Sequence, residues 1–359
     1  MNLYKSPRWI VLQLLEQCNL RCKMCYEWGE HGAYKKTNKR QLDIRVLKKL
    51  VEDCSDYTPY YDLFGGEPLL YKDLEELLEI INYYNSAVDI PTNGVLLKEK
   101  AEMLLKNPPN RIWVSLDGPQ EINDAQRGKG VYKAAVEGID TLLDLRNSKN
   151  GKKPFVGVSC IVTPNNYLFI EDFFMELLKE RNLDQISIEM QLFSSDEQCS
   201  EYGKVLKQNF GVDDNSYARG MIWDVKEFAD INIEELVRQI KAVKNICEKK
   251  NIFMINYPKT VDADNYKNYF SGNFTEMLDN KKRCMLPWTY VEITANGDVA
   301  PCHTYYDLTF GNLYDRSLLD IWSSPQYAAY REYMKSHILP ICTSCSRYYA
   351  YNKKNDIIG

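Results

Sequence analysis

Residues 9–26 read WIVLQLLEQCNLRCKMCY, and this stretch decides the fold. It opens with an apolar run at 9–15, typical of a buried strand, and three cysteines follow at Cys18, Cys22 and Cys25. Three thiolates on one short loop can hold three corners of a [4Fe-4S] cluster and leave the fourth iron open. A zinc site that lacks a ligand, or three thiols that are merely buried, are the alternatives.

Strand-like and helix-like segments alternate along the first half of the chain. Apolar runs of strand length recur at 60–64, 87–92, 111–116, 155–162 and 185–191. Segments with apolar residues at helical spacing lie at 42–54, 72–84, 97–106, 131–146 and 168–181. This alternation predicts an α/β fold with a parallel sheet, open or curved into a barrel, and ligands at the carboxyl ends of its strands.

Composition restricts the function classes. The formal charge of −5 over 359 residues lacks the basic field that drives binding to nucleic acid, so no nucleic-acid partner is expected. The opening MNLYKSPRWI is unlike a signal peptide, and no apolar run reaches about 18 residues, so we expect a cytoplasmic protein with no membrane partner. Eleven cysteines in a reducing compartment suggest metal ligands rather than disulfides.

Three polar motifs follow the next three strands. They are Gly65-Gly66-Glu67-Pro68, Thr92-Asn93-Gly94 and Ser115-Leu116-Asp117-Gly118. Glycines permit close approach of a ligand to the backbone, although Asn and Asp at strand ends are also common turn formers.

The C-x3-C-x2-C spacing after the first strand, followed by these motifs, resembles the radical S-adenosylmethionine (SAM) superfamily. The resemblance implies a partial (β/α)6 TIM-like barrel in which Cys18, Cys22 and Cys25 hold a cluster whose open iron binds SAM. An external one-electron donor, such as flavodoxin or ferredoxin, would then drive formation of a 5′-deoxyadenosyl radical, while the protein binds and orients. The implied SAM-binding residues are Gly65, Gly66, Glu67, Pro68, Thr92, Asn93, Ser115 and Asp117.

Four further residues are weaker candidates for the SAM site. Met24 stands where members of this family usually carry an aromatic residue. The packing role of that aromatic residue could pass to Met24 itself or to Tyr26. Arg127 could meet a carboxylate or could be a solvated surface arginine, and Glu189 lies on the sixth expected strand.

Four more cysteines lie near the end of the chain. Cys284, twelve residues, Gly297, four residues and Cys302 form a spacing that contains the hairpin signal Asn296-Gly297. This pattern, with the later Cys342 and Cys345, resembles SPASM and Twitch domains. It implies a shortened domain with one auxiliary [4Fe-4S] cluster ligated only by protein; a zinc ribbon is the alternative.

We therefore expect a core at 1–225, a bridging or lid segment at 226–275 around a helix at 233–250, and an auxiliary cluster domain at 276–359 with a helical stretch at 318–336. Cys160 is expected in the core and Cys199 in an irregular segment. Each is also a candidate hydrogen donor, because radical epimerases of this superfamily use a thiol for that step.

The resemblance implies hydrogen abstraction from a substrate C–H bond. A residue in a peptide, modified by epimerisation, crosslinking or oxidation, competes with a carbohydrate or aminocyclitol. The triplet begins at residue 18, so a fused peptide-recognition domain is not expected before it. A non-catalytic redox or zinc scaffold is the alternative from another class.

Overall fold

The strands β1 to β7 run parallel and form most of a nine-stranded sheet in the computed structural model, which describes all residues except 1–3, 30–31, 35–39, 280–282, 303–305 and 346–359. The sheet order is β7-β6-β5-β4-β3-β2-β1-β8-β9, so the sheet has two edges and is not a closed barrel. The seven strands are β1 (Trp9–Gln13), β2 (Tyr60–Phe64), β3 (Val88–Thr92), β4 (Arg111–Ser115), β5 (Phe155–Val162), β6 (Gln185–Met190) and β7 (Phe253–Tyr257).

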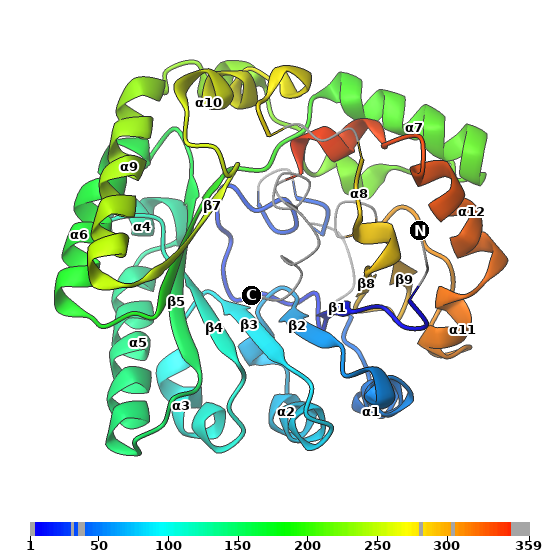
Figure 1. The fold of residues 1–359 in the computed structure, drawn as a ribbon, viewed down its shortest axis with the longest axis horizontal. Helices are drawn as coiled ribbons and strands as arrows, with labels where there is room; N and C mark the ends of the chain where they lie inside the picture. Colours follow the sequence, from blue (N-terminus) through cyan, green and yellow to red (C-terminus); the bar gives the residue numbers. More distant parts are fainter. Residues whose placement is uncertain (1–3, 30–31, 35–39, 280–282, 303–305, 346–359) are drawn as a thin grey trace.

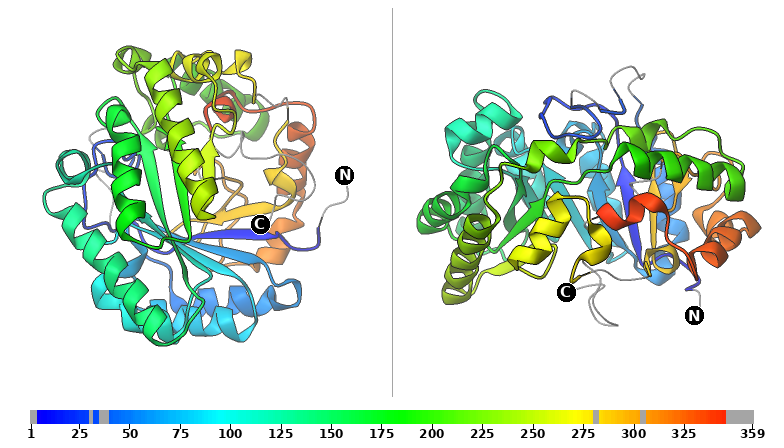
Figure 2. Two further views of the ribbon diagram at one scale, coloured as in Figure 1. Left: turned by 60° about the vertical axis from the view of Figure 1, so that its left-hand side comes forward. Right: turned by 90° about the horizontal axis from the view of Figure 1, so that it is seen from above.

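Helices cover the outer side of this curved sheet (Figures 1 and 2). They are α1 (Ile44–Asp53), α2 (Leu74–Tyr83), α3 (Leu97–Lys106), α5 (Val131–Ser148), α6 (Ile170–Glu180) and α9 (Ile233–Lys250). Each buries one apolar stripe; in α1 this stripe is Leu47, Leu50 and Val51. Burying one such side chain contributes about 1.5–3 kcal/mol, so these stripes hold the layers together.

The two faces of the sheet differ in chemistry. On β5, Val158 and Cys160 belong to the large core beneath the helices, whereas Ser159 is half-buried on the other, concave face. Ser159 is in register with Ser115 on β4 and with Ser187 on β6. Partners in parallel register point to the same side, so three serine side chains form a row across the concave face.

The six strands expected from the sequence are confirmed to within about two residues, but the seventh was missed. β7 pairs in parallel with β6 and follows α9, so it continues the strand and helix alternation. Phe253 is exposed and the rest of β7 is half-buried. An edge strand of this kind lacks the continuous apolar run by which buried strands are recognised.

The irregular segment expected around Cys199 and the bridging segment expected at 226–275 also contain further helices. These are α7 (Asp196–Phe210), α8 (Ser216–Arg219) and α10 (Ala263–Phe270). A further helix, α4 (Gln120–Arg127), lies between β4 and α5. No helix among the described residues is both long and apolar enough to cross a membrane.

The C-terminal hairpin joins the same sheet. β8 (Tyr290–Ile293) pairs in parallel with β1, and β9 (Val299–Ala300) pairs antiparallel with β8. Gly297 turns the hairpin at φ +84°, which confirms the signal at Asn296-Gly297. The domain boundaries at 225 and 275 remain a prediction, because one continuous sheet has strands on both sides of them.

The helical stretch expected at 318–336 is two helices, α11 (Leu318–Trp322) and α12 (Pro325–Met334). The Ser324 side chain accepts a hydrogen bond from the backbone N–H of Tyr327 at 3.3 Å and caps α12, whose first residue is Pro325. Ser before Pro at the first helical position is a favoured helix start. The helical stretch is therefore interrupted there and a new helix begins at Pro325.

The loops after β1 and β2 cross at very short range. The N–H of Gly66 donates to the carbonyl of Leu15 at 2.8 Å, and the N–H of Glu67 donates to that of Gln17 at 3.0 Å. A Cβ at Gly66 would lie 2.3 Å from the carbonyl oxygen of Gln17. Glycine is therefore required here by the chain's own backbone.

Gly66→Ala is expected to lower the free energy of unfolding by more than Gly130→Ala. Gly130 has φ +82° and no atom within 4 Å of an added Cβ, so its substitution costs only the left-handed conformation, about 1–2 kcal/mol. Urea unfolding of both variants measures the difference. Equal losses would show that the loops can separate freely.

Candidate functional site

Cys18, Cys22 and Cys25 lie on the loop that follows β1, at the carboxyl edge of the sheet. The backbone N–H of Leu20 donates to Cys18 Sγ at 3.4 Å, and that of Trp28 donates to Cys25 Sγ at 3.3 Å. Hydrogen bonds to cluster sulfurs are among the features that set reduction potentials. The loop thus carries donors suited to thiolate ligands.

The three thiols are protonated at neutral pH when no metal is bound. Burial raises the pKa of Cys18 to about 11 and that of Cys25 to about 12. Burial also raises the pKa of Cys22, partly offset by the Arg127 charge. Ligation by iron requires thiolates, so cluster assembly here releases protons.

Glu67 ties the second and third motifs together. Its buried carboxylate accepts hydrogen bonds from Thr92 Oγ1 at 2.7 Å and from the N–H groups of Asn93 and Leu69 at 2.8 and 3.0 Å. The Asn93 side chain in turn donates to Asn19 Oδ1 at 2.7 Å, between the first two cysteines. The predicted SAM-binding residues therefore also brace the cysteine loop, and their contact with SAM remains a prediction.

Arg127 is not a surface residue, so that alternative is wrong. It is 8% exposed, and its Nε and Nη2 donate to the Asp117 carboxylate at 2.5 and 3.0 Å. Asp117 is fully buried and also accepts hydrogen bonds from Gln126 Nε2 and the Ile161 N–H. Burial is the largest single influence and would lower the pKa of Arg127, but the Asp117 charge and hydrogen bond, together with the nearby Cys22 and Cys160, make the net shift upward.

This buried pair reaches the cysteine loop. The Cys22 thiol points to the carbonyl oxygen of Arg127 at 3.9 Å, and the N–H of Lys23 donates to the carbonyl of Gln126 at 3.0 Å. The end of α4 thus supports the loop in addition to the backbone contacts made by Gly66 and Glu67.

The remaining predicted residues are spread over the site. Ser115 and Glu189 lie on the concave face, and the Ser187 hydroxyl donates to Glu189 at 3.0 Å. Met24 is half-buried in the cysteine loop, and Tyr26 makes an edge contact with Tyr217.

Neither candidate hydrogen donor lies on the concave face. Cys160 is fully buried in the core, 3.9 Å from Asn166 Nδ2, and Cys199 is buried on α7 with its thiol 3.6 Å from the Ala218 carbonyl. Burial raises the pKa of Cys160 well above its usual range and that of Cys199 to about 11.

Sequence reasoning missed an aromatic cluster beside the loop. Trp28, Tyr34 and Tyr217 are buried together, and Cys18 and Cys25 pack against them. Glu27 lies among these rings; it accepts from Gln13 Nε2 at 2.9 Å and from the Tyr217 hydroxyl at 3.2 Å. Burial raises the pKa of Glu27 to about 8. In the sequence, the only signal for a role of Glu27 was its position two residues after Cys25.

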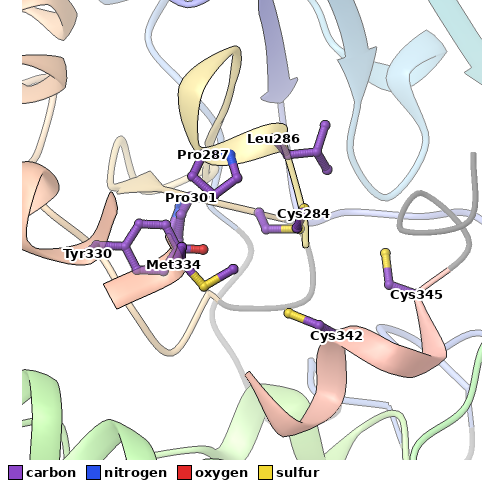
Figure 3. A pocket seen from close by; sticks show the side chains of 9 residues that line it. Cys284, Leu286, Pro287, Pro301, Tyr330, Met334, Cys342 and Cys345 are labelled. Atoms are coloured by element: carbon purple, nitrogen blue, oxygen red, sulfur yellow. The ribbon is translucent and has the colours of Figure 1, made fainter. Parts of the chain in front are cut away.

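The four C-terminal cysteines share one pocket of about 320 Å3, its open mouth included. Cys284 precedes the 3-10 turn Leu286–Trp288, Cys302 follows β9, and Cys342 and Cys345 lie at the turn Pro340–Ser344 (Figure 3). Burial raises the pKa of Cys284 well above its usual range, and Cys342, Cys302 and Cys345 each raise it further. The other lining residues are Leu286, Pro287, Pro301, Tyr330 and Met334.

Both donor sets fit iron–sulfur clusters. One loop supplies three thiols and leaves the fourth iron open to an exchangeable ligand, and one pocket supplies four thiols. In the described ranges, no three Cys, His, Asp or Glu side chains converge as closely as a single metal ion requires. The grouping of the thiols therefore rests on the shared loop and pocket.

A half-barrel with a three-cysteine loop at its carboxyl edge and four further thiols in a C-terminal pocket defines an iron–sulfur enzyme. Residues 12–153 match the radical SAM superfamily, and residues 284–346 match SPASM, an iron–sulfur cluster-binding domain. The chain belongs to the radical SAM superfamily and carries a SPASM domain. The predicted superfamily, fold and cofactors are confirmed.

Relatives cover most of the chain at low identity. The tungsten-containing aldehyde ferredoxin oxidoreductase cofactor-modifying protein of Pyrococcus furiosus is 23% identical over 94% of this chain and 87% of its own length. The Fe-coproporphyrin III synthase of Methanosarcina barkeri is 25% identical over 88% and 73%. Streptococcus suis SuiB bound to precursor peptide SuiA has the same fold, with a TM-score of 0.64 at 18% identity over 97% of this chain and 71% of SuiB.

Arg127→Met is expected to cost about 3–5 kcal/mol of stability, because it leaves the Asp117 carboxylate buried and unpaired. The double variant Asp117→Asn, Arg127→Met removes both charges and should recover part of that loss. Urea unfolding of the three proteins provides the comparison. A single variant as stable as the double variant would contradict the pairing.

Replacing Cys18, Cys22 and Cys25 together with Ala should lower the iron content by about four atoms per chain and abolish SAM cleavage. About four irons should remain at the C-terminal site. Iron assay and chromatography of 5′-deoxyadenosine measure these outcomes.

Cys247→Ala is the control, because Cys247 is buried on α9 and belongs to neither group. It should keep both the iron and the activity. Retained SAM cleavage in the triple variant, or zinc in the C-terminal site of anaerobically purified protein, would overturn the assignments.

Proposed function

We propose that this chain cleaves SAM reductively and removes a hydrogen atom from a C–H bond of a peptide residue. The observation that carries the proposal is the three-thiol loop, which borders the strand-end motifs at Glu67 and Asn93. The bound cluster and SAM supply the electron transfer and the radical; the protein binds, orients and shields.

The residues that contact the cysteine loop help to hold the cofactors in place. Gly65 and Gly66 allow the loops after β1 and β2 to lie against each other, and Asn93 fixes the segment between Cys18 and Cys22. The buried rings of Trp28, Tyr34 and Tyr217 exclude water from one side of the thiols. Exclusion of water protects a reactive intermediate from side reactions.

The concave face supplies the substrate surface. The half-buried Ser115 and Ser159 offer hydrogen-bond donors and acceptors on this face, while the buried Ser187 hydroxyl donates to the Glu189 carboxylate. The sheet ends at β7 and β9 and does not close into a barrel. The bound precursor peptide in SuiB, a protein of the same fold, further supports a peptide.

A precursor of a redox cofactor is the second candidate substrate. Two relatives that cover most of this chain are named for cofactor modification and for Fe-coproporphyrin III synthesis. The same hydrogen abstraction serves either substrate. An external flavodoxin or ferredoxin supplies the electron in both cases.

Peptides and cofactor precursors labelled with deuterium at their C–H positions distinguish these candidates. Reduced, cluster-loaded protein should transfer deuterium from the true substrate into 5′-deoxyadenosine, as measured by mass spectrometry. Transfer from a cofactor precursor alone would replace the peptide assignment. No 5′-deoxyadenosine with any substrate would leave a non-catalytic scaffold.

A further inference from the structure

Arg331 on α12 is a buried cation with neutral partners. It is 4% exposed, its Nε donates to the carbonyl of Pro287 at 2.9 Å, and its Nη1 donates to that of Trp322 at 2.7 Å. Its Nη2 is buried and has no hydrogen-bond partner among the described residues. The guanidinium carbon lies 4.0 Å from the ring centres of both Trp322 and Tyr327.

Such a site is costly for a positive charge. Burial lowers the pKa of Arg331 to about 10, because the charged form loses its hydration. The buried guanidiniums of Arg127 and Arg146 differ, since each pairs with an Asp carboxylate. In the part of the chain that the structure describes, no carboxylate pairs with Arg331.

The uncompensated charge stands behind the wall of the cysteine pocket. Pro287, whose carbonyl Arg331 binds, lines that pocket, and so does the preceding residue on the helix, Tyr330. The guanidinium therefore lies against residues that line the pocket of the thiols.

We propose that Arg331 is the counter-charge of the auxiliary cluster and holds its reduction potential up. The proposal rests on the assignment of Cys284, Cys302, Cys342 and Cys345 to that cluster. Four thiolates carry more negative charge than the iron–sulfur core carries positive charge, so the occupied pocket is anionic. In the cluster-containing protein, the negative charge of the ligated cluster is thus the opposite charge that the neutral partners of Arg331 lack.

The effect on potential follows from Coulomb's law. One-electron reduction adds a negative charge to the cluster, and a fixed cation nearby stabilises the reduced form more than the oxidised form. The interaction is strong because both charges are buried away from water. Charge and burial are established determinants of cluster potentials. Arg331 is accordingly a positioning residue, since it acts through the auxiliary cluster.

The test uses the full chain with Cys18, Cys22 and Cys25 replaced by Ala, so that only the auxiliary cluster contributes. In this background, redox titration followed by electron paramagnetic resonance should show a more negative potential for Arg331→Met. Arg331→Gln, which keeps donors for the carbonyls without the charge, should shift it in the same direction. Arg331→Lys, which keeps a charge, should remain closer to the parent.

Arg146→Met is the matched control, because Arg146 is also buried and donates to a proline carbonyl, that of Pro154, but lies on α5. It should leave the potential unchanged. A potential unaltered in Arg331→Gln, even with reduced stability or iron content, would overturn the proposal and leave a structural role. Absence of iron from the parent background would instead show that the cysteine assignment is wrong.

Discussion

The close crossing of the loops after β1 and β2 is the constraint on which the rest of the site depends. Two backbone hydrogen bonds, from Gly66 to Leu15 and from Glu67 to Gln17, fix the start of the cysteine loop to the neighbouring strand end. A side chain at Gly66 has no room there. The glycine motif is thus needed for the close contact between the two loops as well as for the approach of a ligand. This contact fixes the direction in which the cysteine loop enters the site.

Two buried carboxylates extend this arrangement across the carboxyl edge of the sheet. Glu67 joins the ends of β2 and β3, and Asp117 joins β4, α4 and β5 through Arg127 and the Ile161 N–H. Each carboxylate is satisfied by several donors, which is the condition for burying a charge at acceptable cost. The cysteine loop is therefore supported from the ends of β2, β3 and α4 by polar contacts whose loss would expose or strand a charge.

β8 brings the two sulfur sites into one framework. It adds to the sheet directly beside β1, which leads into the cysteine loop, while the hairpin it forms with β9 leads to Cys302. Gln13, the last residue of β1, binds Glu27 beyond the loop and accepts from the Ala295 N–H after β8. The distance between the sites is thus set by neighbouring strands of one sheet.

The six central strands, the cysteine loop, the strand-end motifs and the hairpin at Gly297 could be predicted from the sequence, because these depend on local periodicity, spacing and turn chemistry. The other features depend on how the chain packs. β7 lies at an edge and lacks a buried strand's pattern, and Asp117 pairs with Arg127 through a contact between different elements. Glu27, Tyr217 and Arg331 acquire their chemistry from burial among residues distant in the chain. Burial and the identity of a charge's partner are properties of the packed molecule, and no local pattern encodes them.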